Sequence, residues 1–263
     1  MKCLVVKVGG HALDSLDPGA DVLIALAEDV AWLIAEDTNV VIVHGGGPQI
    51  QALLDAVGRS SVFHEGLRVT DEETMDCVAM GLSQVNLHLV AALNAAGLAS
   101  VGLSGVDHSM LRASALGELW GRAGTAPKVD VELVRTLWQR SLTPVVSPLA
   151  VDEEGELLNC NADTVAGALA GALDASALVL LSDVDQLRAD PIDESTALSH
   201  VTGDEVRRLI EDGAVKDGMR PKVMAALDAL EGGAQRVFVA NGTRVHALRD
   251  ALAGAVETTE VTR

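Results

Sequence analysis

Two stretches of this chain, LVVKVGG at residues 4–10 and VVIVHGGG at residues 40–47, each run from apolar residues into glycine. Both are typical of buried parallel strands, because Val, Ile and Leu dominate them. A parallel strand that ends in glycine leaves backbone N–H groups at the carboxyl edge of the sheet, and a following helix adds its positive N-terminal end there. With Lys7 inside the first stretch, the two edges predict a cradle for a transferable phosphate group.

The composition predicts an α/β protein with an aliphatic core. Of the 263 residues, 49% are hydrophobic and only 2% are aromatic, so Val, Leu, Ile and Ala must fill the interior. The formal net charge of −19 argues against nucleic acid and against anionic membranes as partners, because both require a basic surface. The ordinary consequence of such acidity is solubility.

The sequence predicts a protein of a reducing compartment. Cys3, Cys77 and Cys160 lie far apart and form no CxxC pair, which is typical of buried thiols. The apolar run at residues 4–6 is too short for a signal peptide. Residues 77–106 carry no formal charge, but several polar side chains interrupt them, so we expect a helix and a strand there and no membrane span. We therefore expect a cytoplasmic protein.

Strand and helix patterns alternate almost to the end of the chain. Strands are expected at 4–8, 40–43, 99–103, 143–147, 177–181 and 236–239. Helices are expected at 20–36, 48–57, 71–96, 129–140, 162–173, 203–212, 221–232 and 245–253, with a small hairpin at 150–158. This pattern predicts a mainly parallel sheet covered on both faces, with ligands at the carboxyl ends of its strands. Two lobes, 1–174 and 175–263, are expected to share that sheet.

The glycine stretches match neither of the common nucleotide-binding fingerprints, since GxxxxGK[ST] and GxGxxG are both missing. The triplet at 45–47 alone also fits an ordinary turn, and Lys7 alone also fits an exposed strand end. A buried ammonium group without a partner is costly. A functional role is therefore favoured only when other polar groups gather at the same edge.

Three further segments place polar side chains at expected helix starts. Arg68 precedes a helix, where it suits either bidentate binding of a carboxylate or a flanking salt bridge. The segment NCNAD, residues 159–163, holds two asparagines and Asp163, more polar groups than one N-cap requires. Lys222 heads another helix and, taken alone, reads as a solvated side chain.

Together these residues supply the kinds of group that catalyse phosphoryl transfer. Lys7 and Lys222 supply cations, the glycine segments supply N–H donors, and Asp163 is placed to hold both lysines. No general base stands beside a nucleophile, and the seven histidines, His44 included, show no metal-ligand spacing and read as structural. A carboxylate acceptor requires no base, because it is already ionised at neutral pH. We therefore expect transfer from a nucleotide to a carboxylate, which gives an acyl phosphate.

Seven motifs in order give the chain a resemblance, over almost its whole length, to the amino acid kinase family. They are KVGG at 7–10, HGGGPQ at 44–49, GLRVTD at 66–71, GLSG at 102–105, NCNAD at 159–163, LSDV at 181–184, and GM at 218–219 with Lys222. The resemblance implies a three-layer α/β/α sandwich around one mainly parallel sheet. It also implies ATP-dependent phosphorylation of the γ-carboxylate of N-acetyl-L-glutamate in arginine biosynthesis, with Mg²⁺ held mainly by ATP oxygens.

The same resemblance implies roles for individual residues. Lys7 and Lys222 would stabilise charge on the transferring phosphoryl group, Asp163 would orient both lysines, and Arg68 would clamp the α-carboxylate. Substrate contacts would fall on Gly46, Gly47, Asn159 and Asn161, and nucleotide contacts on Gly9, Gly10, Asp183, Val184 and Lys222. The lobe 1–174 would bind the acyl amino acid and form the dimer, and the lobe 175–263 would bind ATP.

Some positions depart from the family pattern, and two other functions stay open. Gln186 and His108 stand where the family often has glycine, and Val106 stands where it often has lysine. One alternative is a kinase for aminoadipate or glutamate attached to an acidic carrier protein, which the acidity of this chain disfavours. The other is an amino-acid sensor without turnover, which the intact lysines disfavour. Arginine-inhibited relatives carry an extra N-terminal helix, so we expect a homodimer without strong arginine feedback.

Overall fold

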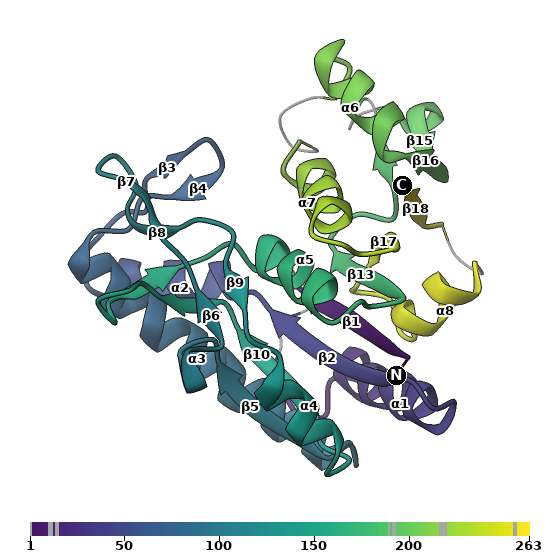
Figure 1. Ribbon diagram of the computed structural model, residues 1–263, viewed down its shortest axis with the longest axis horizontal. Coiled ribbons are helices and arrows are strands. Elements are labelled where there is room, and N and C mark those ends of the chain that lie inside the picture. Colours follow the sequence, from purple (N-terminus) through teal and green to yellow (C-terminus); the bar gives the residue numbers. More distant parts are fainter. Residues whose placement is uncertain are drawn as a thin grey trace.

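The computed structural model describes residues 2–9, 13, 16–188, 190, 193–215, 220–254 and 257–263. Gly10, Gly218 and Met219, which belong to the motifs above, lie outside the described residues. Within the described part, helices and strands alternate much as the sequence predicts, and the largest unit is an eight-stranded sheet (Figure 1).

The central sheet is mainly parallel, as predicted. Its strands follow the order β16 (His200–Thr202), β18 (Thr259–Thr262), β17 (Arg236–Asn241), β13 (Ala177–Ser182), β1 (Cys3–Val8), β2 (Asn39–His44), β10 (Thr143–Ser147) and β5 (Ser100–Ser104). The strands from β17 to β5 all run parallel, whereas β18 is antiparallel to β17. Because β1 and β13 are neighbours in the middle of the sheet, both halves of the chain share it.

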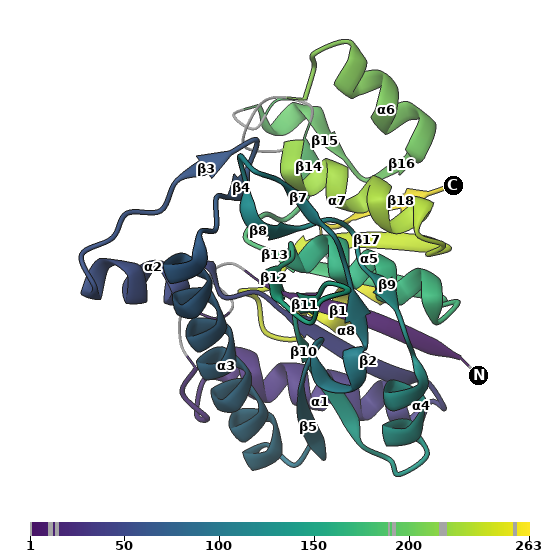
Figure 2. The same ribbon diagram turned by 60° about the vertical axis from the view of Figure 1, so that its left-hand side comes forward.

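Helices cover both faces of the sheet, which gives three layers (Figures 1 and 2). The helices are α1 (Asp21–Ala35), α2 (Gly47–Ala56), α3 (Glu72–Ala95), α4 (Glu132–Trp138), α5 (Ala162–Ala172), α6 (Gly203–Glu211), α7 (Arg220–Glu231) and α8 (Ala247–Ala253). One apolar core lies between the sheet and α1, α3 and α8, and the other lies between the sheet and α4, α5 and α7. Helix α2 packs on α3, and α6 packs on α7.

The alternation of side chains along β1 decides where its lysine points. Leu4, Val6 and Val8 join the core beneath α1 and α8, whereas Val5 joins the core beneath α5. Successive residues of a strand point to opposite faces. Lys7 therefore falls on the α5 face, at the end of the strand where α5 begins.

Helices α5 and α7 lie close together because glycine and alanine form their contact. A Cβ atom placed on Gly171 would lie 1.3 Å from the carbonyl oxygen of Gly232, and one on Gly167 would lie 2.9 Å from the Cα of Ala229. Larger side chains at these positions would push the helices apart. Since both helices begin at the carboxyl edge of the sheet, this contact sets the relative position of their first turns.

Helix α3 is a core helix. Among the described residues, it is the helix whose length and composition would suffice to cross a membrane. Its residues Val78, Val85 and Leu89 are fully buried, and it packs on α1, α2 and β5. The helix predicted at its position from the sequence is confirmed.

One predicted helix is shorter than expected. The sequence predicts a helix over 129–140, but α4 spans only Glu132–Trp138. Val129 instead pairs with Leu111 in an antiparallel ladder. The carboxylate of Asp130 accepts a hydrogen bond from the first amide of α4, at 2.9 Å. This ladder and turn delay the start of the helix.

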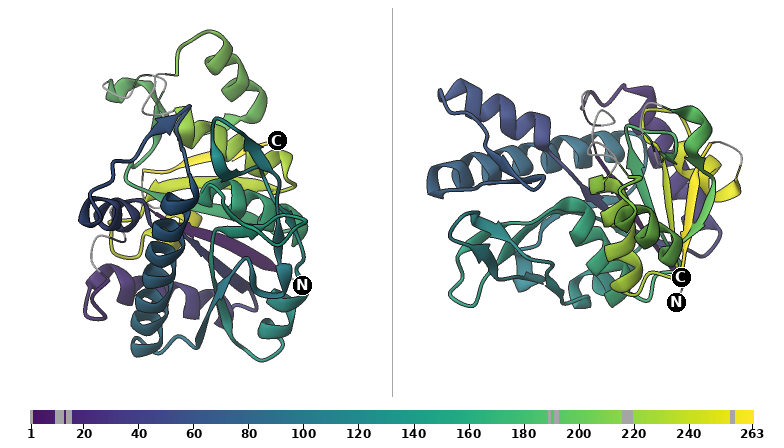
Figure 3. Two further views of the ribbon diagram at one scale, coloured as in Figure 1. Left: turned by 90° about the vertical axis from the view of Figure 1, so that its left-hand side faces the viewer. Right: turned by 90° about the horizontal axis from the view of Figure 1, so that it is seen from above.

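A second sheet consists of short strands, of which the sequence predicts only the hairpin at 150–158. Its order is β7 (Ala115–Gly117), β8 (Gly121–Gly124), β12 (Leu157–Asn159), β11 (Leu149–Val151), β6 (Leu111–Arg112) and β9 (Lys128–Val129). Two further pairs join β3 (Phe63–His64) to β4 (Leu67–Arg68) and β14 (Leu187–Arg188) to β15 (Ala197–Leu198), and 3₁₀ turns span Asp107–Ser109 and Glu194–Thr196. Strands this short show no detectable alternation. The hairpins β3–β4 and β7–β8 project from the same end of the molecule (Figures 1 and 3).

Candidate active site

The carboxyl edge of the parallel strands gathers the predicted glycine segments. Val8 at the end of β1 is in register with the last residue of β2 and with Leu181 of β13, so the glycines that follow β1 and β2 are neighbours. The amides of Gly9 and Gly45 are not free. They donate to the carbonyl oxygens of Leu181, at 3.2 Å, and of Val8, at 2.9 Å.

The start of α2 offers amides for an anion instead. This helix follows Gly46 and begins at Gly47, and within the described residues no side chain caps its first turn. A Cβ atom on Gly47 would meet nothing within 4 Å. Uncapped N–H groups at a helix start attract anions. The first turn of α2 therefore offers uncapped N–H groups at the edge where the sequence predicts a phosphate cradle.

A cavity of about 340 Å³ lies against this edge. Segments from β1, α2, the β3–β4 hairpin, β8 and the start of α5 form its wall. Eight of the predicted site residues line it: Lys7, Gly9, Gly46, Gly47, Arg68, Asn159, Asn161 and Asp163. Residues that are distant in the sequence thus meet around one space, as predicted.

Lys7 and Asp163 form an ion pair at the wall of this cavity. The Lys7 Nζ lies 2.8 Å from the Asp163 Oδ1, and the two side chains are 12% and 22% exposed. A Cβ atom on Gly9 would lie 2.2 Å from the Lys7 Nζ. Glycine at this position therefore leaves the space that the ammonium group occupies.

Lys222 has a carboxylate partner of its own. Its Nζ lies 2.9 Å from the Asp183 Oδ1, which also accepts a hydrogen bond from the Ser182 hydroxyl at 3.0 Å. Burial raises the pKa of the Asp183 carboxyl, but the hydrogen bond and charge of Lys222 outweigh burial and hold that pKa below its usual value.

The predicted contact of Asp163 with both lysines does not appear in the structure, because each lysine pairs with a separate carboxylate. Asp163 stands in the first turn of α5, on the face to which β1 directs Lys7. Asp183 directly follows β13, where the first turn of α7 reaches it. Within the described part of the chain, Lys222 is not among the residues that line the cavity.

Arg68 enters the cavity from β4 and makes only weak neutral contacts among the described residues. Its guanidinium nitrogens lie 3.5 Å from the Gln51 Oε1 and 3.4 Å from the Gly47 carbonyl oxygen, and its Cζ lies 4.8 Å from the centre of the Phe63 ring. Partial burial lowers the pKa of the guanidinium below its usual value, yet an arginine stays charged. The flanking salt bridge considered from the sequence is not seen among the described residues. Arg68 therefore retains donors for an anionic ligand.

The asparagines have distinct environments. The Asn161 Oδ1 caps α5 by accepting hydrogen bonds from the amides of Asp163 and Thr164, at 2.7 and 3.3 Å. This leaves the Asn161 Nδ2 as a donor at the cavity wall. The Asn159 Nδ2 donates to the Thr70 hydroxyl at 3.1 Å, which leaves the Asn159 Oδ1 as an acceptor.

His44 is a structural residue, as predicted. Its Nε2 lies 3.0 Å from the Asn86 Nδ2, whose amide group also donates to the Val145 carbonyl oxygen at 2.9 Å. The Asn86 nitrogen is therefore a donor, the His44 Nε2 is an acceptor, and the Nδ1–H donates to the Gly45 carbonyl oxygen at 2.8 Å. Complete burial lowers the pKa of His44 from 6.5 to about 4. A neutral imidazole thus fixes the glycine loop.

Cys160 also lines the cavity. All three cysteines are free and buried, as the sequence predicts. Burial raises the pKa of the Cys160 thiol to about 12. This thiol stays protonated at neutral pH and does not act as a nucleophile.

A polar cluster that the sequence analysis missed lies at the carboxyl ends of β13 and β17. The Asp185 Oδ1 lies 2.6 Å from the Arg244 Nη2 and accepts a hydrogen bond from the Asn241 side chain at 3.2 Å. One feature of the sequence could have indicated this cluster: the polar residue Asn241 directly follows the apolar residues of β17. Val184 packs in part against the core. Gln186, which departs from the family pattern, donates to the Thr258 carbonyl oxygen at 3.2 Å.

Comparisons with known proteins agree with this architecture. The amino acid kinase family matches residues 2–241 of the chain. An acetylglutamate kinase of Methanocaldococcus jannaschii is 42% identical over 260 residues, covering 94% of this chain and 85% of that protein. An acetylglutamate kinase of Methanococcoides burtonii is 39% identical over 258 residues, covering 93% and 84%. The structure of N-acetylglutamate synthase from Neisseria gonorrhoeae superimposes with a TM-score of 0.83 at 24% identity, covering 100% of this chain and 59% of that longer chain. The structural likeness confirms the predicted fold.

The buried neutral state of His44 predicts a dependence of stability on pH. His44 has a pKa of about 4 when folded and an ordinary value of 6.5, so the unfolded chain binds more protons between these values. The contribution of His44 is complete above pH 6.5 and decreases as pH falls from 6.5 to 4. Between pH 7 and pH 5 we expect a loss of about 2 kcal/mol in the free energy of unfolding from this residue.

Urea unfolding of the wild type and of His44→Gln at both pH values measures this loss. The glutamine variant stays neutral, so its free energy of unfolding should decrease by about 2 kcal/mol less than that of the wild type. Equal losses in the two proteins would show that His44 does not titrate on unfolding.

Proposed function

This chain belongs to the amino acid kinase family, and we propose that it transfers the γ-phosphate of ATP to the γ-carboxylate of N-acetyl-L-glutamate. The observation that carries the proposal is the cavity itself. One wall holds the Lys7–Asp163 ion pair beside the first turn of α2, and Arg68 lies at the same cavity without a carboxylate partner among the described residues. A dicarboxylate fits this arrangement, with one carboxylate held by Arg68 and the other brought to the phosphate cradle.

The proposed reaction is a single displacement at phosphorus. A γ-carboxylate oxygen of the acyl amino acid forms a bond to the γ-phosphorus, and the bond from this phosphorus to the bridging oxygen breaks. The electron pair of that bond stays on the terminal oxygen of ADP. The acceptor is already ionised at neutral pH. The reaction therefore requires no general base, and charge stabilisation is the main task of the protein.

Each lysine has a separate part in this proposal. Lys7 stabilises the charge of the transferring phosphoryl group from the acceptor side, where Asp163 fixes its position. Lys222, held by Asp183, stabilises the charge that develops on the leaving ADP. The amides at the start of α2 and the Asn161 Nδ2 donate to the phosphoryl group and the substrate. Such fixed donors require little reorganisation during the reaction.

The nucleotide is proposed to lie over the ends of β13 and β17, in the lobe 175–263. Asp183, Val184 and Lys222 lie there, close to the missed cluster of Asp185, Asn241 and Arg244. Gly10, also proposed for this site, lies outside the described residues. Mg²⁺ would be held mainly by oxygens of ATP. The lobe 1–174 binds the acyl amino acid in this proposal.

Two further expectations accompany the proposal. A cytoplasmic location stays a prediction from the sequence, as does a homodimer formed by the lobe 1–174. The exposed apolar side chains Met80 and Leu87 on α3 support a self-association surface, because large apolar side chains at a helix surface favour burial against a partner. Sedimentation velocity measures the homodimer directly, and a monomer at micromolar concentration would rule it out.

Trapping with hydroxylamine tests the reaction itself. An acyl phosphate reacts with hydroxylamine to give a hydroxamate, so purified protein with MgATP and N-acetyl-L-glutamate should form one hydroxamate for each ADP released. Free glutamate and a carrier-linked amino acid serve as competing acceptors. Hydroxamate from the carrier-linked acceptor alone would favour the carrier-dependent kinase. Binding of N-acetyl-L-glutamate without any turnover would favour a sensor.

Replacing either lysine should slow the chemical step. We expect Lys7→Ala and Lys222→Ala each to lower kcat by roughly 10²–10³, which corresponds to about 3–4 kcal/mol of transition-state stabilisation. Lys128→Ala is the matched control, because Lys128 is exposed on β9 and does not line the cavity. Losses below threefold in both lysine variants, measured as ADP release at saturating substrates, would contradict the roles proposed for them.

Arg68→Lys should affect substrate binding more than chemistry. A lysine ammonium cannot form the two parallel hydrogen bonds that a guanidinium gives a carboxylate. We expect the KM for N-acetyl-L-glutamate to rise about tenfold or more, with little change in the KM for ATP. Arg59→Lys is the control, since Arg59 pairs with Asp71 and Glu73 at the surface. An increase confined to the KM for ATP would show that Arg68 does not bind the acyl amino acid.

A further inference from the structure

We propose that His108, Asp130 and Glu132 form a binding site for a divalent transition-metal ion, with Zn²⁺ as the best-fitting ion. The three side chains are exposed, and none of them lines the cavity described above. The site is therefore separate from the proposed phosphoryl transfer and from the Mg²⁺ that accompanies ATP. Its three ligands come from two segments of the chain, since Asp130 follows His108 by 22 positions.

Backbone pairing brings these segments together. Leu111 of β6 pairs with Val129 of β9, and the amide of Asp130 donates to the Met110 carbonyl oxygen at 2.9 Å. His108 precedes this ladder on one strand, and Asp130 follows it on the other. Glu132 is the first residue of α4. Backbone pairing therefore sets the relative positions of the segments that carry the three side chains.

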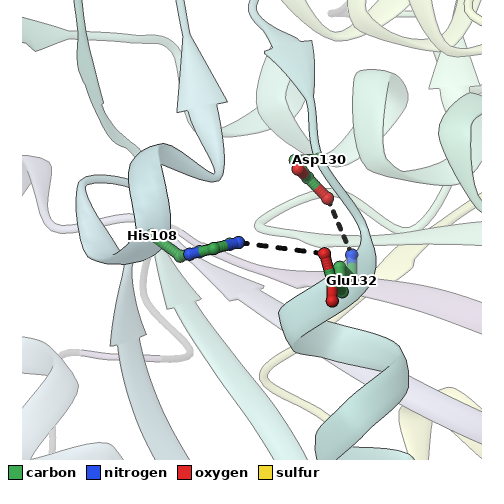
Figure 4. Close-up of side chains that lie close together, drawn as sticks. All are labelled: His108, Asp130 and Glu132. Carbon is green, nitrogen blue, oxygen red and sulfur yellow. Dashed lines mark hydrogen bonds and ion pairs between the residues drawn. The ribbon is translucent and has the colours of Figure 1, made fainter.

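The three side chains converge on one point (Figure 4). The His108 Nε2 lies 4.0 Å from the Glu132 Oε2, and one ligand atom from each residue lies within 4.8 Å of the others. The Asp130 carboxylate is held by a hydrogen bond from the Glu132 amide, at 2.9 Å. Around a bound Zn²⁺, at about 2.0–2.2 Å from each ligand atom, these atoms would lie about 3–3.5 Å apart. Rotation of the exposed side chains can supply a contraction of about 1 Å.

The donor set selects the class of ion. One imidazole nitrogen with two carboxylate oxygens suits Zn²⁺, Co²⁺ and Ni²⁺, whereas Mg²⁺ and Ca²⁺ prefer oxygen ligands throughout. Two carboxylates also neutralise a divalent ion, and water completes its coordination. The positive end of the short helix α4 opposes a cation near Glu132. The formal charge of −19 on the chain acts in the opposite direction.

The backbone at His108 gives a second reason to assign a role to this imidazole. His108 and Ser109 have φ angles of +56° and +47°, in the left-handed region. Residues with a Cβ atom seldom adopt this conformation, whereas glycine adopts it freely. The chain thus carries an imidazole at a position that would favour glycine. A bound ion would connect the turn after β5 to the first turn of α4.

Calorimetric titration of the protein without an affinity tag, after treatment with EDTA and without nucleotide, tests the proposal. We expect one equivalent of Zn²⁺ to bind, with Co²⁺ competing and millimolar Mg²⁺ not competing. His108→Gly and Glu132→Gln should each weaken Zn²⁺ binding about tenfold or more. His200→Ala is the matched control, because His200 is also exposed and pairs with a single carboxylate, that of Glu260. This control should bind Zn²⁺ like the wild type.

Thermal unfolding gives an independent readout. Without an ion, His108→Gly should be at least as stable as the wild type, because glycine relieves the left-handed backbone. With excess Zn²⁺ the order should reverse, since binding stabilises only the folded wild type. Kinase activity with MgATP should stay within about twofold in this variant, because His108 lies outside the proposed reaction.

Two results would overturn the site. One is the absence of Zn²⁺ binding to the wild type up to about 1 mM. The other is equal Zn²⁺ affinity of the wild type, His108→Gly and Glu132→Gln, which would place any bound ion elsewhere on the chain. Neither result bears on the proposed kinase function, which the hydroxamate assay tests separately.

Discussion

The pairing of Lys7 with Asp163 is the constraint around which the rest of the site is arranged. An ammonium group at the end of a buried strand is tolerated only with a charged partner and room for its head group. Asp163 supplies the partner at 2.8 Å, and the missing side chain of Gly9 supplies the room. Asn161 caps the first turn of α5, which carries Asp163, by accepting hydrogen bonds from the amides of Asp163 and Thr164. A local cap therefore fixes the position of a catalytic candidate on a different element.

The same helix connects the two halves of the molecule. Gly167 and Gly171 allow α7 to approach α5 at backbone distance, and both helices begin at the same edge of the sheet. The first turn of α7 carries Lys222, which meets Asp183 at the end of β13. The relative position of the two lysines thus depends on the packing of small residues that lie about 6–12 Å along α5 from Asp163, given a rise of about 1.5 Å per residue. A change in the distance between α5 and α7 would move one ammonium group relative to the other.

The sequence predicts those site residues whose positions depend mainly on the strand or helix in which they stand. Lys7 lies near the end of β1 and the glycines directly follow β1 and β2, so the parallel sheet brings them together as expected. Asn161 is a capping residue by type and position, and the structure confirms the cap. The sequence predicted Asp163 as the partner of Lys222, whereas the structure pairs Lys222 with Asp183. This partner depends on which strand end the first turn of α7 reaches, and the sequence does not show that. The free amides also lie at α2 and not at Gly9 and Gly45, whose amides extend the ladder of the sheet.

The sequence does not predict features that arise from pairing between distant short segments. The strands β6 and β9 have two residues each, too few for a periodic pattern. Their pairing shortens α4, and it also brings His108 to Asp130, which no spacing along the chain reveals. The cluster of Asp185, Asn241 and Arg244 arises in the same way, from the ends of two parallel strands that are far apart in sequence.

The charges around the proposed site are compatible with acidic ligands, although the chain as a whole is acidic. Each lysine is neutralised by one carboxylate, so the two ammonium groups are fixed in place without a strong positive field between them. Arg68 differs, since its contacts among the described residues are neutral and longer than ordinary hydrogen bonds. Among the described residues that line the cavity, Arg68 is thus the cation best placed to attract a carboxylate in the proposed reaction. In the proposed reaction, the lysines would then act on a substrate whose position is already set. Under the proposed function, Arg68 would serve capture and orientation, and the paired lysines would stabilise the charge that develops during transfer.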